Sequence, residues 1–204
     1  MPSSTTKGTI LSFLYPISSS SEKISTSHIP RTTSSVLYKA ADPTYSKPYL
    51  VVSTVDDVAY VDVAQVCKFW GEKEGVEKVD VRVFEGVQVF EKGKDNPAHT
   101  LLVALMQPAP GGAAELDAWY REEHNEQMSQ QPGWLRTCRY SLVAQRGTDS
   151  EAEKEKQFSC LAIHEFEERN ALGDTVKALE PVSEWTKKVM SEAEGIDAAI
   201  YRKI

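Results

Sequence analysis

The chain has 204 residues, of which 41% are hydrophobic and 26% charged, a composition typical of a soluble globular protein with one large or two small domains. Its formal net charge of −7 disfavours a nucleic-acid partner, because excess carboxylates repel a phosphate backbone. No apolar run reaches the roughly 20 residues that a membrane-spanning helix needs, so we expect no membrane partner. Three cysteines without a CxxC pair favour a reduced, cytoplasmic protein.

The first half of the chain contains patterns for four strands and one clear helix. Apolar or alternating residues predict strands at 9–15, 35–40, 49–57 and 79–90, and the residues at 61–74 have helical spacing. His28 follows the first strand, in a serine-rich segment where we expect a helix of two turns or fewer. The predicted order is therefore strand, short helix, two strands, helix and strand.

The second half repeats this order. Strands are predicted at 100–106, 134–143, 160–168 and 198–204, with one helix from residue 116 and another at 170–193. Pro132-Gly133 ends the first of these helices, because both residues interrupt helical geometry. The order strand, helix, strand, strand, helix, strand in each half is the ferredoxin-like plan.

A ferredoxin-like sheet has one bare face, and two such sheets can cover each other in a closed arrangement without exposed edges. We therefore predict an α+β fold in which two β-α-β-β-α-β repeats form a barrel of the dimeric α+β type, with the helices outside. The predicted halves are residues 1–96, a degenerate N-terminal half, and residues 97–204, a C-terminal half that carries the site. Each pocket would lie between the helices and the sheet.

The helix that begins near Leu116 carries a histidine on its apolar side. Leu116, Tyr120, His124 and Met128 recur every four residues and therefore share one face. The three other residues favour burial and bring His124 inward, next to a strand rich in aromatic and arginine side chains. A core histidine that bonds to a neighbour is the commoner result of such a pattern. The alternative is a small proton-transfer pocket.

The segment from Leu116 to Val143 resembles the EthD-like proteins of the dimeric α+β barrel superfamily, in the duplicated form common among fungi. The N-terminal half keeps only the skeleton of the pattern and lacks its Trp-Tyr pair, so we predict that its site has degenerated. Asn125-Glu126 also departs from the usual Ile-Pro of the family. The resemblance is carried by Trp119-Tyr120, Glu123-His124, Pro132-Gly133-Trp134, Arg136, Arg139-Tyr140 and the run from Ile163 to Glu167.

This resemblance implies a cofactor-independent enzyme of secondary metabolism. The chain would catalyse cyclisation or a related lyase step on a polyketide- or terpenoid-like intermediate, with a histidine as acid or base. Decarboxylation or dehydration of an aromatic polyketide, haem binding and non-catalytic ligand binding are the alternatives, because the superfamily also contains haem enzymes and members without known chemistry. The expected partner is a small apolar or aromatic substrate, and a homodimer is left open.

The predicted site combines two histidines with aromatic, sulfur and arginine side chains. His164 alternates with Ala162 and Phe166 on its strand, so it either shares a cavity with His124 or faces the barrel interior. Arg136 and Arg139 point to opposite faces; a buried one could bind a carboxylate or enolate, although an ion pair with Glu122, Glu123 or Glu165 is commoner. The predicted catalytic residues are His124 and His164, and the predicted substrate-binding residues are Trp119, Tyr120, Met128, Trp134, Arg136, Arg139 and Tyr140.

Overall fold

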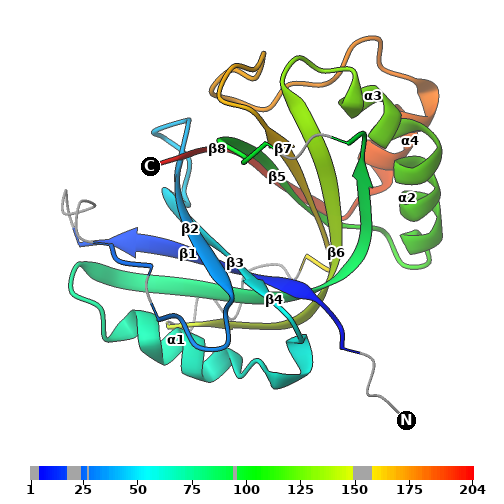
Figure 1. Cartoon of the computed structure of the whole chain (residues 1–204). Helices are drawn as coiled ribbons and strands as arrows, with labels where there is room; N and C mark the ends of the chain where they lie inside the picture. Colours follow the sequence, from blue (N-terminus) through cyan, green and yellow to red (C-terminus); the bar gives the residue numbers. More distant parts are fainter. Residues whose placement is uncertain (1–4, 18–23, 27, 94–95, 149–157) are drawn as a thin grey trace.

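The structure, a computed structural model, describes residues 5–17, 24–26, 28–93, 96–148 and 158–204. In this part of the chain eight antiparallel strands close into one barrel, in the order β1-β3-β2-β8-β5-β7-β6-β4 (Figure 1). The strands are β1 (Gly8–Pro16), β2 (Ser34–Ala40), β3 (Tyr49–Val55), β4 (Val76–Glu91), β5 (Thr100–Gln107), β6 (Trp134–Gly147), β7 (Cys160–Phe166) and β8 (Gly195–Lys203).

The helices lie outside the barrel, on two separate sides (Figure 1). Helix α1 (Val63–Gly71) packs on β4, and its N-terminus is capped by the Asp62 carboxylate, which accepts hydrogen bonds from two backbone N–H groups. On the other side α2 (Ala113–Trp119), a π-helical turn η3 (Tyr120–His124) and α3 (Asn125–Ser129) form one continuous rod, packed beside α4 (Glu184–Glu192). A 3₁₀ turn, η2 (Val58–Tyr60), follows β3.

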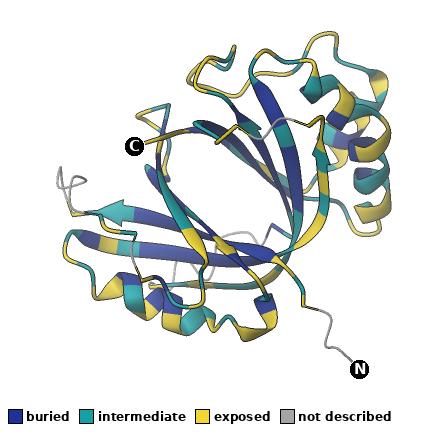
Figure 2. Cartoon of the chain, viewed as in Figure 1, coloured by how far each residue is buried: buried dark blue, intermediate teal, exposed yellow. Residues whose placement is uncertain are grey.

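Alternate side chains from strands around the barrel pack together in its interior. Figure 2 shows that many residues of these strands are buried. It also contains a charged pair on β4. The Arg82 guanidinium donates to the Asp80 carboxylate at 2.6 Å, both side chains are fully buried, and the Arg82 guanidinium lies 5.4 Å from the ring centroid of Phe13. Intervening β4 residues point the other way and pack under α1. The barrel interior is therefore a hydrophobic core that also contains a buried charged pair.

The expected fold of two ferredoxin-like β-α-β-β-α-β repeats is wrong, because the structure is one closed antiparallel barrel with few helices. The described residues between β1 and β2 form no helix, and His28 and Arg31 there have positive φ angles, which helical residues do not adopt. Nor do the halves form two separate sheets. β4 pairs with β6 and β2 pairs with β8, so the strand pairing runs continuously around the barrel.

Two further differences concern the second half. The helix expected at 170–193 is confined to α4, since residues 170–181 follow an irregular path over the outside of the barrel. β4 and β6 extend beyond their predicted bounds and form the longest ladder, from Asp80–Gly147 to Glu91–Arg136. No helix in the described ranges is long and apolar enough to cross a membrane.

Candidate functional site

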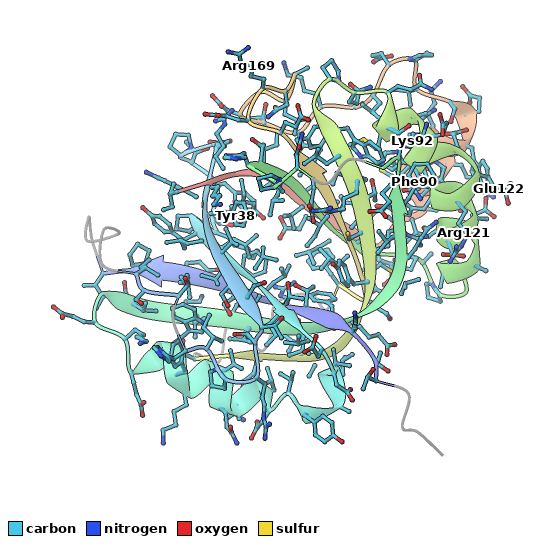
Figure 3. The ribbon with its side chains drawn as sticks, viewed as in Figure 1. Tyr38, Phe90, Lys92, Arg121, Glu122 and Arg169 are labelled. Carbon is cyan, nitrogen blue, oxygen red and sulfur yellow. The ribbon has the colours of Figure 1, made fainter. Side chains whose placement is uncertain are left out.

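The α2-η3-α3 rod presents the predicted apolar stripe to the sheet. Leu116, Tyr120 and Met128 are buried, and His124 between them is partly exposed. The rod widens into a π-helical turn from Tyr120 to His124. Such turns are rare and often occur at functional sites. Figure 3 shows Arg121 and Glu122 on the outer side of the rod, so this turn separates a charged outer face from the face that carries His124.

The His124 imidazole is enclosed by aromatic rings. It stacks on Trp119 with ring centroids 4.2 Å apart, and the Tyr120 ring meets it edge-on at 5.3 Å. The pKa of His124 is lowered from 6.5 to about 4, mainly by burial; the Glu123 carboxylate opposes this shift, and the nearby Arg139 contributes to it. Neither ring nitrogen has a hydrogen-bond partner within the described residues. The ring is therefore neutral near pH 7, with both nitrogens available.

His164, on β7, is 1% exposed and lies next to His124, with ring centroids 5.4 Å apart. Its Nδ1 is 2.8 Å from the Thr137 hydroxyl, which accepts a hydrogen bond from Trp134 Nε1 at 3.2 Å. If the Thr137 hydroxyl donates its proton to Nδ1, the Trp134 N–H, the Thr137 hydroxyl and His164 Nδ1 all have a hydrogen-bond partner. With the His164 proton on Nδ1 instead, the hydroxyl proton would have no acceptor in this series. The arrangement favours the His164 tautomer with its proton on Nε2.

Both imidazoles line one cavity of about 380 Å³ between the helices and the sheet. Small side chains, Ala104 of β5 and Ala198 of β8, form part of its floor. Residues 171–173 and 175–179 of the irregular segment before α4 form its outer wall. The segment is held by Asn170, whose amide donates to Thr100 Oγ1 at 3.1 Å and accepts from the Leu172 N–H at 3.0 Å. The cavity is within the size range of small-molecule sites, about 300–1,000 Å³.

The predicted residues divide into two groups. The structure brings Trp119, Tyr120 and Met128 together with the two histidines around the cavity. Trp134 does not line the cavity; it is buried against Phe90, packs in one cluster with Met128, and donates a hydrogen bond to Thr137. The other three predicted residues, Arg136, Arg139 and Tyr140, do not line this cavity.

The two arginines lie on opposite faces of β6. Arg136 donates to Glu165 at 2.7–2.8 Å, which is the ion pair that the sequence also allowed, so it has no place in the cavity. Arg139 points to the helix side, with its guanidinium 4.3 Å from the Tyr120 ring centroid. Tyr140 is largely buried, and burial raises the pKa of its hydroxyl, so the phenol stays protonated.

A second polar chain, which the sequence did not reveal, supports the rod from α4. Trp119 Nε1 donates to Thr186 Oγ1 at 3.1 Å, and this hydroxyl donates to the Glu123 carboxylate at 2.9 Å. The Ser183 hydroxyl also donates to Glu123 at 2.6 Å, and this bond is the main reason why the pKa of Glu123 is lowered. These bonds fix the orientation of the Trp119 ring on which His124 stacks.

Sequence reasoning also missed Thr137 and the outer wall at 171–179. The only local signal for Thr137 was its position on the same strand as Trp134 and Arg139. The wall was assigned to a helix because its apolar residues have partly helical spacing, although Gly173 and Pro181 interrupt it.

No family model matches this sequence, and no curated protein matches it significantly. Solved structures do share its fold. An "anthrone oxidase-like protein" is 11% identical with a TM-score of 0.60, covering 98% of this chain and 92% of its own. A "putative monooxygenase" of Lactobacillus acidophilus is 10% identical with a TM-score of 0.56, covering 97% of this chain and 94% of its own. A second "putative monooxygenase", from Fusobacterium nucleatum, is 8% identical with a TM-score of 0.55, covering 98% of this chain and 94% of its own.

At these identities the likeness shows the fold alone, a closed antiparallel barrel with a few helices outside it. It supports neither the EthD-like assignment nor a fungal origin. The match extends over nearly the whole of each chain.

Proposed function

We propose that this chain is a small-molecule enzyme in which His124 exchanges a proton with an aromatic or polyketide-like substrate held in the large cavity. One observation carries the proposal: an imidazole without any hydrogen-bond partner in the described structure faces an apolar space of about 380 Å³. The partly exposed ring lines this cavity, so a ligand bound there can supply the hydrogen-bond partner that the described residues do not. The names of the structural neighbours also favour chemistry on small molecules.

The two histidines have complementary roles in this proposal. The low pKa keeps His124 unprotonated, so a ring nitrogen accepts a proton from an acidic C–H or O–H group of the substrate. The enolate that forms stabilises the new imidazolium through its opposite charge. His164 donates its Nε2 proton in a hydrogen bond to the enolate oxygen. In a cyclisation the enolate carbon bonds to a carbonyl carbon, and the carbonyl oxygen then takes the proton from His124.

A second reaction starts from the same enolate and is favoured by the neighbours' names, anthrone oxidase-like protein and monooxygenase. Here dioxygen oxidises the deprotonated carbon. A methylene group becomes a carbonyl group, with one oxygen atom entering the product and the other leaving as water. Both reactions therefore require the same proton transfer to His124, and they differ in whether dioxygen is consumed.

Anthrone, a flat aromatic ketone with an acidic methylene group, is a suitable probe for this shared step. Exchange of its methylene protons in D₂O should be faster with the protein than without it. His124→Ala should remove about a hundredfold or more of any acceleration, the usual contribution of a general base. His99→Ala is the matched control, because His99 does not line the large cavity.

Two outcomes would contradict the proposal. One is an anthrone exchange rate that wild-type protein leaves unchanged, and the other is a His124→Ala variant that accelerates exchange as much as wild type does. If exchange is accelerated, oxygen uptake equal to the anthraquinone formed would favour the oxygenase reaction. Acceleration without oxygen uptake would favour cyclisation or another lyase step.

A further inference from the structure

A smaller cavity of about 230 Å³ adjoins the large one. Ala104, Met106 and Tyr120 line both cavities, so these side chains form the partition between them. Within this partition the Tyr120 hydroxyl donates to Met106 Sδ at 3.7 Å, and sulfur is only a weak acceptor. Methionine is flexible, and it can therefore move aside for a ligand that extends from one cavity into the other.

Arg139 lines the smaller cavity with a nearly buried side chain, 10% exposed. Its Nη1 donates to Gln88 Oε1 at 2.8 Å and lies 2.9 Å from Asp117 Oδ1. Its Nε and Nη2 have no hydrogen-bond partner in the described ranges. The guanidinium is held in place by Gln88, Asp117 and the Tyr120 ring, while part of its donor edge is left for a ligand.

The charges around this cavity favour an anion. Asp117 accepts from Arg121 Nε at 2.7 Å as well as facing Arg139, so one carboxylate is shared by two guanidinium groups. The Arg121 hydrogen bond is also the main reason that the pKa of Asp117 is lowered, so this carboxylate stays charged. Arg121 lies outside the cavity, and with it the two lining groups Arg139 and Asp117 carry one excess positive charge. A buried arginine fork with free donors suits the two oxygens of a carboxylate.

We propose that the smaller cavity binds the carboxylate or phenolate of a ligand whose aromatic part occupies the large cavity. The substrate class is then an aromatic acid or an acidic phenol, with Arg139 Nε and Nη2 as donors to its oxygens. This inference rests on the proposed function only in placing the rings beside His124. It adds a binding group that lies outside the cavity in which the reaction takes place.

The test compares 2-naphthoate with 2-naphthamide, which has the same rings without the charge. Binding is followed by titration calorimetry on the whole chain. Wild type should bind the acid about tenfold or more tightly than the amide, because hydrogen bonds to a charged group are the stronger ones. Arg139→Gln should remove this preference and leave amide binding nearly unchanged. Arg146→Gln, an exposed arginine of the same strand, should keep the preference.

NMR signals of the wild-type protein provide a second readout, which does not require that any variant folds. On adding the acid, both the Arg139 Nε–H signal and the His124 ring signals should shift, whereas the amide should shift those of His124 alone. Equal affinity for acid and amide, or an unmoved Arg139 signal, would overturn the proposal. If the acid shifts the Arg139 signal but not the His124 signals, the proposal that one ligand occupies both cavities is wrong. These binding results are separate from proton exchange, so failure of the proposed reaction can be recognised independently.

Discussion

The pKa of His124 predicts a specific loss of stability in acid. Above pH 6.5 the ring is neutral in both the folded and the unfolded chain, so it adds nothing to the pH dependence. Between pH 6.5 and about 4 the unfolded ring takes up a proton that the folded ring does not. The free energy of unfolding must therefore fall as the pH falls through this window.

The size of the effect follows from the shift. One pKa unit corresponds to about 1.4 kcal/mol, so a pKa lowered from 6.5 to about 4 gives about 3 kcal/mol over the full window. Most of this, about 2 kcal/mol, is already lost at about pH 4.5. His164 adds to the loss in the same direction, because burial and the neighbouring His124 lower its pKa as well.

The assay is urea unfolding of wild type and His124→Gln at about pH 7.5 and about pH 4.5. The variant cannot titrate at this position, so its free energy of unfolding should fall by about 2 kcal/mol less than that of wild type. His99→Gln serves as the control for losing a histidine outside the cavity. An equal acid loss in wild type and His124→Gln would mean that the ring is hydrated and titrates normally, and the argument from burial would fail.

Three further perturbations test the surroundings of the site. Thr137→Val removes the hydroxyl that bonds to His164, so it should slow turnover and shift the NMR signals of the His164 ring nitrogens. Thr137→Ser keeps the hydroxyl and should preserve both. Unchanged signals in the valine variant would refute the tautomer argument. Ala198→Leu should fill the floor of the large cavity and prevent ligand binding without lowering Tm, and unaltered naphthamide affinity would place the ligand elsewhere. Arg82→Leu takes the guanidinium from the buried Asp80 and should cost about 3–5 kcal/mol in urea unfolding; a loss below about 1 kcal/mol would show that the pair is hydrated.

The position of His124 could be predicted because its cause is local. The four-residue spacing of Leu116, Tyr120 and Met128 defines a buried helix face whatever the rest of the chain does, and all three are buried. The strands were also largely predictable, since their apolar runs do not depend on which partner each strand finds. The spacing of His164 left open whether its ring faces the cavity or the barrel interior. In the structure the ring lines the cavity together with His124.

The contacts that complete the site depend on long-range pairing, which no local pattern contains. Thr137 reaches His164 because β6 pairs with β7, and Gln88 reaches Arg139 because β4 pairs with β6. For the same reason the continuous pairing around the barrel was missed. Each half could be assigned its elements separately, but the ladders between β4 and β6 and between β2 and β8 join residues of different halves.

The difference between the halves has a simple physical cause in the size of the side chains under the helices. Within each half the strands follow the same spatial order, β4-β1-β3-β2 and β8-β5-β7-β6. The face under α1 carries branched residues such as Val51, Val81 and Val83, and the fully buried Trp70 packs against them. The corresponding face of the second half carries Ala104 and Ala198. Aliphatic side chains and Trp70 occupy the space between α1 and the sheet, whereas Ala104 and Ala198, beside the larger Leu102, line the cavity under the rod. His124 gains a cavity because the sheet opposite it has alanines, so the residues that create the site are those with the least chemistry of their own.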